Sequence, residues 1–173
     1  MEDSPVFNNS MQTRLAEIKL VLTDCDGVLT DGGVYYGAEG EQLKKFNIRD
    51  GMGVERLRKW AEIPTGIITG ERSPSVQQRA AKLNITELHL GIKDKERVLM
   101  EILERYALAP EQIAYIGDDV NDLVVRPYVG VFFCPSDALH QVKKQADIVL
   151  QLPGGAGCFR EMAELILEAK GVN

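Results

Sequence analysis

Short apolar runs alternate along the chain with longer segments in which apolar residues recur every three or four positions. The short runs are typical of strands buried on both faces, and the longer segments are typical of amphipathic helices. The expected strands lie at residues 18–23, 63–69, 85–90, 112–117, 130–134 and 146–150. The expected helices lie at residues 51–61, 74–83, 94–107, 120–126, 137–144 and 158–170. This alternation predicts an α/β fold, a Rossmann-like parallel sheet with helices on both faces.

Residues 32–48 interrupt this alternation, because two short β-like runs flank the turn-rich sequence GAEGE. The pattern predicts a β-hairpin flap that follows the first strand and projects from the carboxyl edge of the sheet. No other segment is large enough for a separate lid, so we expect a capless fold. Residues 1–15 are expected to be a polar N-terminal tail, and residues 153–173 a C-terminal tail and helix. A chain of 173 residues is expected to form a single domain.

Composition excludes several classes of protein. No apolar run approaches the roughly 20 residues that span a bilayer, and the first residues lack a secretory pattern, so we expect a cytoplasmic protein without a membrane partner. The net charge of −6, without a basic cluster, argues against nucleic acid but is compatible with a small anionic substrate. The three cysteines, Cys25, Cys134 and Cys158, include no CxxC pair, which indicates reduced thiols rather than disulfides or a zinc site.

Polar residues stand at the ends of several expected strands. Asp24 directly follows the first strand, Thr69 ends the second, and Asp118 directly follows the fourth. Lys95 stands just inside the start of the helix that follows the third strand. In open parallel sheets, ligands bind beyond the carboxyl ends of the strands. The fold is therefore expected to gather these four residues into one crevice.

The first of these segments, TDCDGVLTDGG, places Asp24 and Asp26 two positions apart, with a turn at Gly27. One carboxylate could act as the nucleophile in phosphoryl transfer while the other protonates the leaving oxygen. The alternative is a solvated turn, since Asp and Gly are common in turns.

A second acidic segment, GDDVND, occupies residues 117–122. Carboxylate oxygens at adjacent strand ends suit Mg²⁺, which prefers hard oxygen ligands. The expected metal ligands are the carboxylates of Asp24 and Asp118 and the backbone carbonyl of Asp26. Asp119 and Asp122 are expected to support these ligands or to lie at a helix N-terminus. Taken alone, the segment also fits a calcium-like acidic loop or a plain helix cap.

The remaining candidates are hydrogen-bond donors. Lys95 would neutralise both the nucleophile and the transferring phosphoryl group, and Thr69 and the Gly70 amide would donate to phosphate oxygens. Taken alone, a lysine near a helix start is more often a solvated charge. Neither GxxxxGK[ST] nor GxGxxG occurs, so a P-loop or dinucleotide site is unsupported. His89 and His140 have no partner at catalytic spacing and are expected to be structural.

Together, DCDGVLTDG, ITG, the Lys95 segment and GDDVND resemble the motifs of the haloacid-dehalogenase-like phosphatase superfamily, over essentially the whole chain. The hairpin, FNIRDGMG and the tail motif GGAGCFRE resemble its capless branch, which includes phosphatases of 3-deoxy-D-manno-octulosonate 8-phosphate. The resemblance implies that Asp24 is phosphorylated, that Asp26 is the general acid/base, and that Asp118 binds Mg²⁺. It implies that Thr69 and Lys95 bind the phosphate.

The same resemblance implies a sugar-acid phosphatase of lipopolysaccharide or sialic-acid-type biosynthesis. It also implies a homotetramer, in which hairpins and tails of neighbouring subunits complete and close each active site.

One departure concerns the residue after Thr69-Gly70, where octulosonate phosphatases often have arginine and this chain has Glu71. Glu71 and Lys82 resemble instead the related phosphatases of nine-carbon acids, such as 2-keto-3-deoxynononate 9-phosphate and N-acylneuraminate 9-phosphate. They would then contact sugar hydroxyls and the substrate carboxylate, although Glu71 equally fits an ion pair. Arg79 and Arg160 resemble basic positions available to the substrate or to an interface, although Arg79 equally fits a helix-surface arginine.

Two other functions are compatible with this superfamily. A non-catalytic assembly or regulatory module would use the tetrameric scaffold, but such modules usually lose the nucleophile, the acid or the lysine, and all three are present here. A phosphotransferase or mutase usually needs a cap domain, and the hairpin is too small to be one.

Overall fold

Six parallel strands form the central sheet of the protein, whose computed structural model describes residues 9–172. Their order across the sheet is β5-β4-β1-β6-β7-β8. The strands are β1 (Leu20–Thr23), β4 (Thr65–Ile68), β5 (Glu87–His89), β6 (Ile113–Ile116), β7 (Val131–Cys134) and β8 (Ile148–Val149). Each lies inside a run expected from the sequence, so the predicted α/β fold is confirmed.

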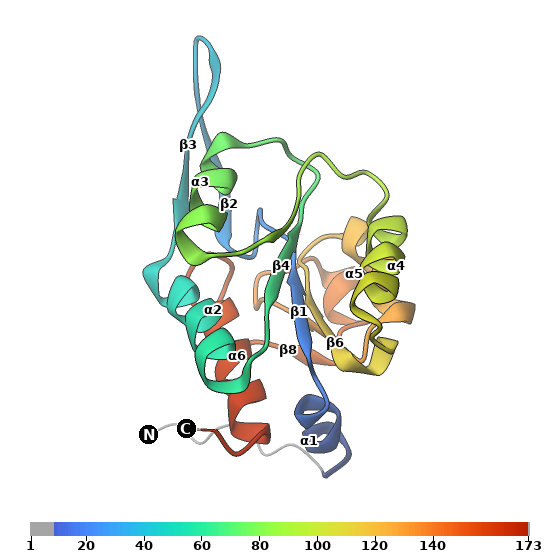
Figure 1. The fold of residues 1–173 in the computed structure, drawn as a ribbon. Helices are drawn as coiled ribbons and strands as arrows, with labels where there is room; N and C mark the ends of the chain where they lie inside the picture. Colours follow the sequence, from blue (N-terminus) through green and yellow to red (C-terminus); the bar gives the residue numbers. More distant parts are fainter. Residues whose placement is uncertain (1–8, 173) are drawn as a thin grey trace.

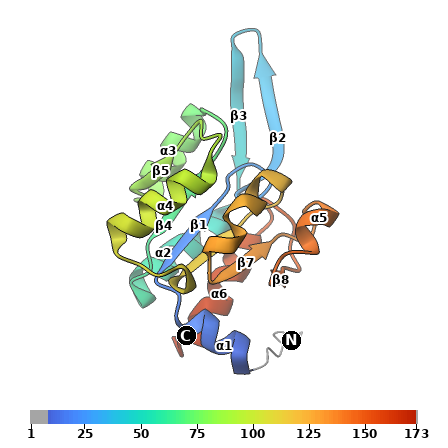
Figure 2. The same ribbon diagram turned by 90° about the vertical axis from the view of Figure 1, so that its right-hand side faces the viewer.

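Helices cover both faces of this sheet (Figures 1 and 2). One face carries α1 (Asn9–Ala16), α2 (Ile48–Ala61), α3 (Pro74–Leu83) and α6 (Cys158–Ala169). The other carries α4 (Lys95–Tyr106), the 3₁₀ segment η2 (Val120–Tyr128) and α5 (His140–Lys143), while a 3₁₀ turn, η1 (Pro110–Gln112), precedes β6. Side chains alternate along each strand. Val21 of β1 accordingly packs in the first core, and Leu20 and Leu22 pack in the second.

Two of the expected helices differ in kind or length from the prediction. The segment expected at 120–126 is a 3₁₀ helix, because Pro127 lies inside it and the Asp122 carboxylate turns back to accept the backbone N–H groups of the preceding turn. The segment expected at 137–144 forms only the single turn of α5.

The N-terminal helix α1 contradicts the expected polar tail over residues 1–15. Leu15 is 1% exposed and packs in the core beside α6, and Arg14 Nη2 forms an ion pair of 2.8 Å with Asp147 Oδ1. Both contacts join residues far apart in the sequence, and a helix with a single buried leucine has almost no periodicity to detect. Residues 1–8 of the expected tail lie outside the described part of the chain.

The predicted flap is present as a separate two-stranded antiparallel sheet of β2 (Thr30–Gly37) and β3 (Gly40–Phe46). It projects beyond the carboxyl ends of the parallel strands, as the upper part of Figure 1 shows. The flap expected at 32–48 is thus confirmed, although α2 begins at Ile48 rather than at residue 51. Asn47 sets that start, since its Oδ1 accepts the Arg49 backbone N–H at 2.8 Å.

Cys25, Cys134 and Cys158 are free and buried. Among residues 9–172, no helix is both long enough and apolar enough to cross a membrane.

If α1 belongs to the folded core, Leu15→Ala should lower the free energy of unfolding by about 2–5 kcal/mol, because it leaves a cavity against α6. Chemical denaturation monitored by circular dichroism measures this change. Gln12→Ala is the matched control, since Gln12 is exposed on the same helix, and it should change stability by less than about 0.5 kcal/mol. Equal stability of both variants would contradict the packing of α1.

Candidate active site

The carboxyl ends of three neighbouring strands meet at one edge of the sheet, with β1 between β4 and β6. The residues that follow these strands line one pocket of about 190 Å³. Its lining residues are Asp24, Asp26, Thr69, Gly70, Glu71, Asp118, Asp119 and Asn121. The predicted convergence of the strand-end residues in one crevice is therefore what the structure shows.

The turn after Asp24 approaches the second acidic segment so closely that it requires glycine. Gly27 has a φ of +86°, and a Cβ atom at this position would lie 2.0 Å from Asp118 Oδ2. The backbone N–H groups of Leu29 and Thr30 donate to the Cys25 carbonyl at 2.9 and 3.1 Å, which closes the turn. Asp26 is thereby held over the same pocket as Asp118.

Lys95 is the cation of this site. It begins α4, its side chain is only 2% exposed, and its Nζ lies 3.0 Å from Asp24 Oδ1 and 2.7 Å from Asp122 Oδ1. Desolvating a charge is costly unless partners compensate for it, and two carboxylates do so here. The alternative of a solvated lysine is thus wrong, and the predicted contact with Asp24 is confirmed.

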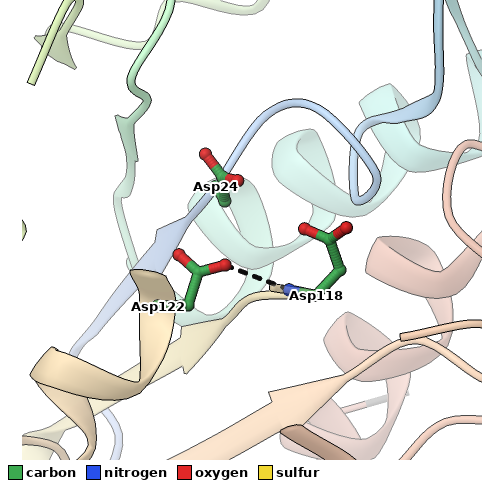
Figure 3. A group of neighbouring side chains, drawn as sticks. All are labelled: Asp24, Asp118 and Asp122. Atoms are coloured by element: carbon green, nitrogen blue, oxygen red, sulfur yellow. Dashed lines mark hydrogen bonds between the residues drawn. The ribbon is translucent and has the colours of Figure 1, made fainter. Parts of the chain in front are cut away.

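Asp122 is the fully buried carboxylate that organises the site (Figure 3). Its Oδ1 accepts hydrogen bonds from Lys95 Nζ at 2.7 Å and from the Tyr115 hydroxyl at 2.6 Å. Its Oδ2 accepts the backbone N–H groups of Asp118 at 3.1 Å and Asp119 at 3.3 Å. Because both oxygens are engaged, Asp122 orients the neighbouring groups, which agrees with the supporting role expected from the sequence.

Two residues that support this carboxylate escaped the sequence analysis. The apolar pattern of residues 112–117 marks Tyr115 only as a strand residue. A buried tyrosine hydroxyl needs a hydrogen-bond partner, and that requirement is the signal in the sequence. A Cβ atom on Gly117 would lie 2.4 Å from the Asp122 Cγ atom, so glycine is needed for the close approach of β6 to η2.

The acidic cluster fits a hard divalent cation. One oxygen each of Asp24, Asp118 and Asp122 lies within 4.8 Å of the others. Asp118 Oδ1 is buried without a hydrogen-bond partner, and Asp24 Oδ1 has only its ion pair with Lys95. Buried oxygens without donors are costly unless a cation or water satisfies them, and an all-oxygen set suits Mg²⁺. Since Asp122 is saturated, Asp24 and Asp118 are the carboxylates left to hold an ion.

Burial and mutual repulsion raise the pKa of two carboxyl groups near this cluster. The pKa of Asp24 is raised to about 7, chiefly by burial and then by the charge of Asp122, although Lys95 opposes the shift. The pKa of Asp118 is also raised to about 7, by burial and then by the charges of Asp24 and Asp122. Without a cation, the folded protein therefore holds protons that the unfolded chain releases between pH 4 and 7.

Asp26 has a partner from the flap that the sequence analysis did not identify. The Lys44 side chain of β3 is 0% exposed, and its Nζ lies 2.6 Å from Asp26 Oδ1 and 3.5 Å from Glu41 Oε2. Burial lowers the pKa of Lys44, but the hydrogen bond to Asp26 and the two negative charges outweigh burial and raise it. The sequence LKKF offers two adjacent lysines, and nothing in it shows which one turns inward.

Three of the expected substrate-binding residues lie outside the pocket around Asp24 within the described protomer. Arg79 Nη2 donates to the Asn47 carbonyl at 2.8 Å, so this guanidinium joins α3 to the start of α2. Arg160 Nε forms an ion pair of 2.5 Å with Glu164 on α6, and Lys82 is exposed on α3. The sequence allows Arg79 either near the crevice or on a plain helix surface. The structure instead places it between α2 and α3.

The other expected residues are where the sequence places them. Gly70 and Glu71 line the pocket next to Thr69. The His89 ring is hydrogen-bonded to the Glu87 carboxylate on β5, and His140 begins the short helix α5. Neither histidine lines the pocket around Asp24.

Comparison with known proteins places this fold and site in a family. The haloacid dehalogenase-like hydrolase family matches residues 67–155. The 3-deoxy-D-manno-octulosonate 8-phosphate phosphatase KdsC of Haemophilus influenzae is 43% identical over 161 residues, which cover 93% of this chain and 89% of that protein. The chain therefore belongs to the haloacid dehalogenase-like hydrolases. The prediction of a phosphoric monoester hydrolase is confirmed at the level of this family.

Two solved structures are similar over nearly the whole chain. The 3-deoxy-D-manno-octulosonate 8-phosphate phosphatase of Yersinia pestis superposes with a TM-score of 0.91 at 40% identity, covering 94% of this chain and 88% of that one. The corresponding phosphatase of Moraxella catarrhalis, in complex with a magnesium ion, a phosphate ion and a KDO molecule, gives a TM-score of 0.91 at 33% identity, covering 95% and 94%.

Mg²⁺ should raise the melting temperature of the protein, and more strongly at pH 8 than at pH 5.5. At the lower pH the ion must displace protons from Asp24 and Asp118, whose pKa values are about 7. At about 100 times the dissociation constant, the gain is about 2.7 kcal/mol. Without Mg²⁺, the contribution of these two groups to stability falls as pH rises from 4 to 7, because the folded state binds more protons there.

Asp118→Asn is the test variant for this prediction, and differential scanning calorimetry with and without MgCl₂ is the measurement. Asp118→Asn should lose most of the shift at pH 8. Glu168→Gln, on the exposed surface of α6, should keep it. A full shift in Asp118→Asn would show that the ion binds elsewhere.

Proposed function

We propose that the chain is a magnesium-dependent phosphatase of a 3-deoxy-2-ulosonic acid phosphate. The observation that carries this proposal is the pairing of Asp24 with a buried Lys95 in a pocket shared with Asp26, Thr69 and Asp118. The substrate class rests on similar proteins, which are named 3-deoxy-D-manno-octulosonate 8-phosphate phosphatases.

In the proposed first step, a carboxylate oxygen of Asp24 attacks phosphorus and the bond from phosphorus to the sugar oxygen breaks. Asp26 donates its proton to that oxygen, which leaves as a sugar hydroxyl group. Lys95, 3.0 Å from Asp24 Oδ1, favours the charged form of the nucleophile against the opposing effects of burial and Asp122, and it would face the negative charge that develops on the phosphoryl oxygens. Thr69 lies in the pocket as a hydrogen-bond donor to the same oxygens.

In the second step, water attacks the phosphorus of the phosphoryl-aspartate. Asp26, now a carboxylate, takes a proton from this water, and the bond between phosphorus and the Asp24 oxygen breaks. Inorganic phosphate leaves, Asp24 is again a carboxylate, and Asp26 again carries its proton. The single acid/base thus serves both steps.

The Asp24 and Asp118 carboxylates would hold Mg²⁺, together with the backbone carbonyl of Asp26. When bound, the ion supplies positive charge to the phosphoryl oxygens. The unpartnered oxygens of the acidic cluster support this assignment, as does the magnesium ion named in the Moraxella catarrhalis complex.

Two lengths of the sugar-acid carbon chain, eight and nine carbons, are candidates for the substrate. The similar phosphatases act by name on the eight-carbon octulosonate 8-phosphate. Glu71 lines the pocket beside Thr69, where it would accept hydrogen bonds from sugar hydroxyls of a nine-carbon 2-keto-3-deoxynononate 9-phosphate.

We further propose a homotetramer in which flaps and tails of neighbouring subunits complete each active site. The flap exposes large side chains that a monomer would leave in water: Tyr35 is 60%, Tyr36 73% and Leu43 63% exposed. Clustered exposed apolar groups mark interaction surfaces. Lys82 and Arg160, which lie outside the pocket of their own protomer, would contact substrate or interface in such an assembly.

A non-catalytic assembly module of the same fold is the second candidate. The nucleophile, the acid and Asp118 in one pocket, with Lys95 paired to the nucleophile, favour the enzyme. A transferase is disfavoured because the described residues form no cap beyond the small flap.

Asp24→Asn should lower the rate of phosphate release by about 10³-fold or more, because the amide cannot form the phosphoryl-enzyme. The assay is phosphate release from 3-deoxy-D-manno-octulosonate 8-phosphate with Mg²⁺. Asp31→Asn, in the same segment but paired with Lys45 at the base of the flap, is the control and should remain active. Turnover that survives in Asp24→Asn would refute the nucleophile.

Glu71→Arg should change the ranking of substrates if Glu71 contacts sugar hydroxyls. We expect kcat/KM for the nine-carbon phosphate to fall more than kcat/KM for the eight-carbon phosphate. A panel of sugar-acid phosphates measures the ratio, with Gln77→Ala on α3 as the control. A uniform decrease for all substrates would remove Glu71 from substrate recognition.

A further inference from the structure

The two carboxylate oxygens of Asp26 have different surroundings. Oδ1 accepts a hydrogen bond of 2.6 Å from Lys44 Nζ and one of 3.3 Å from Thr30 Oγ1. Oδ2 is buried and has no hydrogen-bond partner in the protein. Asp26 lines the pocket with Asp24, so the two donors fix one oxygen and leave the other available to a ligand.

Lys44 reaches Asp26 because of the alternation of side chains along β3. The neighbouring side chains face solvent: Leu43 is 63% exposed, and the Lys45 side chain is 61% exposed and pairs with Asp31 on β2. The Lys44 side chain is 0% exposed. A charged side chain on a projecting hairpin gains nothing from burial by itself, so its burial requires the carboxylate that it meets.

A second contact joins the same strand to the start of α3. Glu41 of β3 accepts a hydrogen bond from the Ser73 hydroxyl, and Ser73 Oγ also accepts the Val76 backbone N–H at 3.4 Å at the start of α3. Glu41 Oε2 lies 3.5 Å from Lys44 Nζ, which joins the two contacts. Strand β3 of the flap is therefore bound to its own protomer at two places, through Lys44 to Asp26 and through Glu41 to Ser73.

We propose that Lys44 is a positioning residue for the general acid. It holds Oδ1 of Asp26 so that Oδ2 faces the leaving oxygen of the substrate. The inference rests on the proposed function and extends it: the flap fixes the acid of its own protomer, apart from any contact that it makes with a neighbouring subunit.

A comparison of leaving groups tests this role. A sugar alkoxide leaves only with protonation, whereas the p-nitrophenolate of p-nitrophenyl phosphate and the acetate of acetyl phosphate need little. Departure of the leaving group completes the first transfer, so kcat/KM reports this step and not the later attack of water. Lys44→Met should lower kcat/KM for the sugar-acid phosphate by roughly 10- to 100-fold and should change the activated phosphate by less than roughly threefold.

Asp26→Asn should show the same selective loss, and Lys44→Met combined with Asp26→Asn should lose no more than Asp26→Asn alone. Lys45→Met is the matched control, since it removes the adjacent lysine and its ion pair from the outer face of β3. Lys45→Met should leave kcat/KM unchanged for both the sugar-acid phosphate and the activated phosphate. Circular dichroism and melting temperature check the fold of each variant, and Lys44→Gln serves as a second replacement.

Several results would overturn the inference alone. These are equal losses on both substrates, no loss on either, additive losses in the double variant, or failure of both Lys44 replacements to fold. The proposed function would fail differently, with a wild-type protein that hydrolyses neither phosphate or an Asp24→Asn variant that remains active.

Discussion

The ion pair between Lys95 and Asp24, backed by Asp122, is the interaction on which the site depends. It joins the start of α4 to the end of β1 and the first turn of η2, three segments far apart in the sequence. None of the three charges is stable in a buried position alone, since burial disfavours the charged form of each group. The three charged groups are therefore stable at this edge of the sheet only when all three segments are in contact. The same contacts form the pocket.

Glycines allow the backbone segments around this site to approach one another closely. Gly27 lets the turn after β1 pass over Asp118, and the tail that precedes α6 packs against the same turn. The Gly155 backbone N–H donates to the Val28 carbonyl at 2.8 Å, and a Cβ atom on Gly154 would lie 2.0 Å from the Gly27 carbonyl oxygen. The tail motif GGAG is therefore a structural brace for the loop that carries Asp26, in addition to any contact with neighbouring subunits.

The sequence predicted most of the sheet and the shared pocket, because strand ends and buried runs are local signals that the parallel topology converts into proximity. It failed where a contact depends on distant partners. The helix α1 is defined by packing on α6, and Arg79 lies between α2 and α3, neither of which local periodicity records. Lys44 could not be separated from Lys45, because the choice depends on which face of β3 meets the domain.

In the proposed reaction, Asp24, Lys95 and Asp118 act together on one phosphoryl group beside one magnesium ion. The decisive experiment is a crystal structure of the protein with Mg²⁺ and beryllofluoride, a mimic of the phosphoryl group on aspartate. Beryllofluoride should be attached to Asp24, with Lys95 in contact with its fluorides and the ion bound by Asp24 and Asp118. Beryllofluoride on another residue, or Asp118 and Lys95 out of contact with the occupied site, would contradict this reaction.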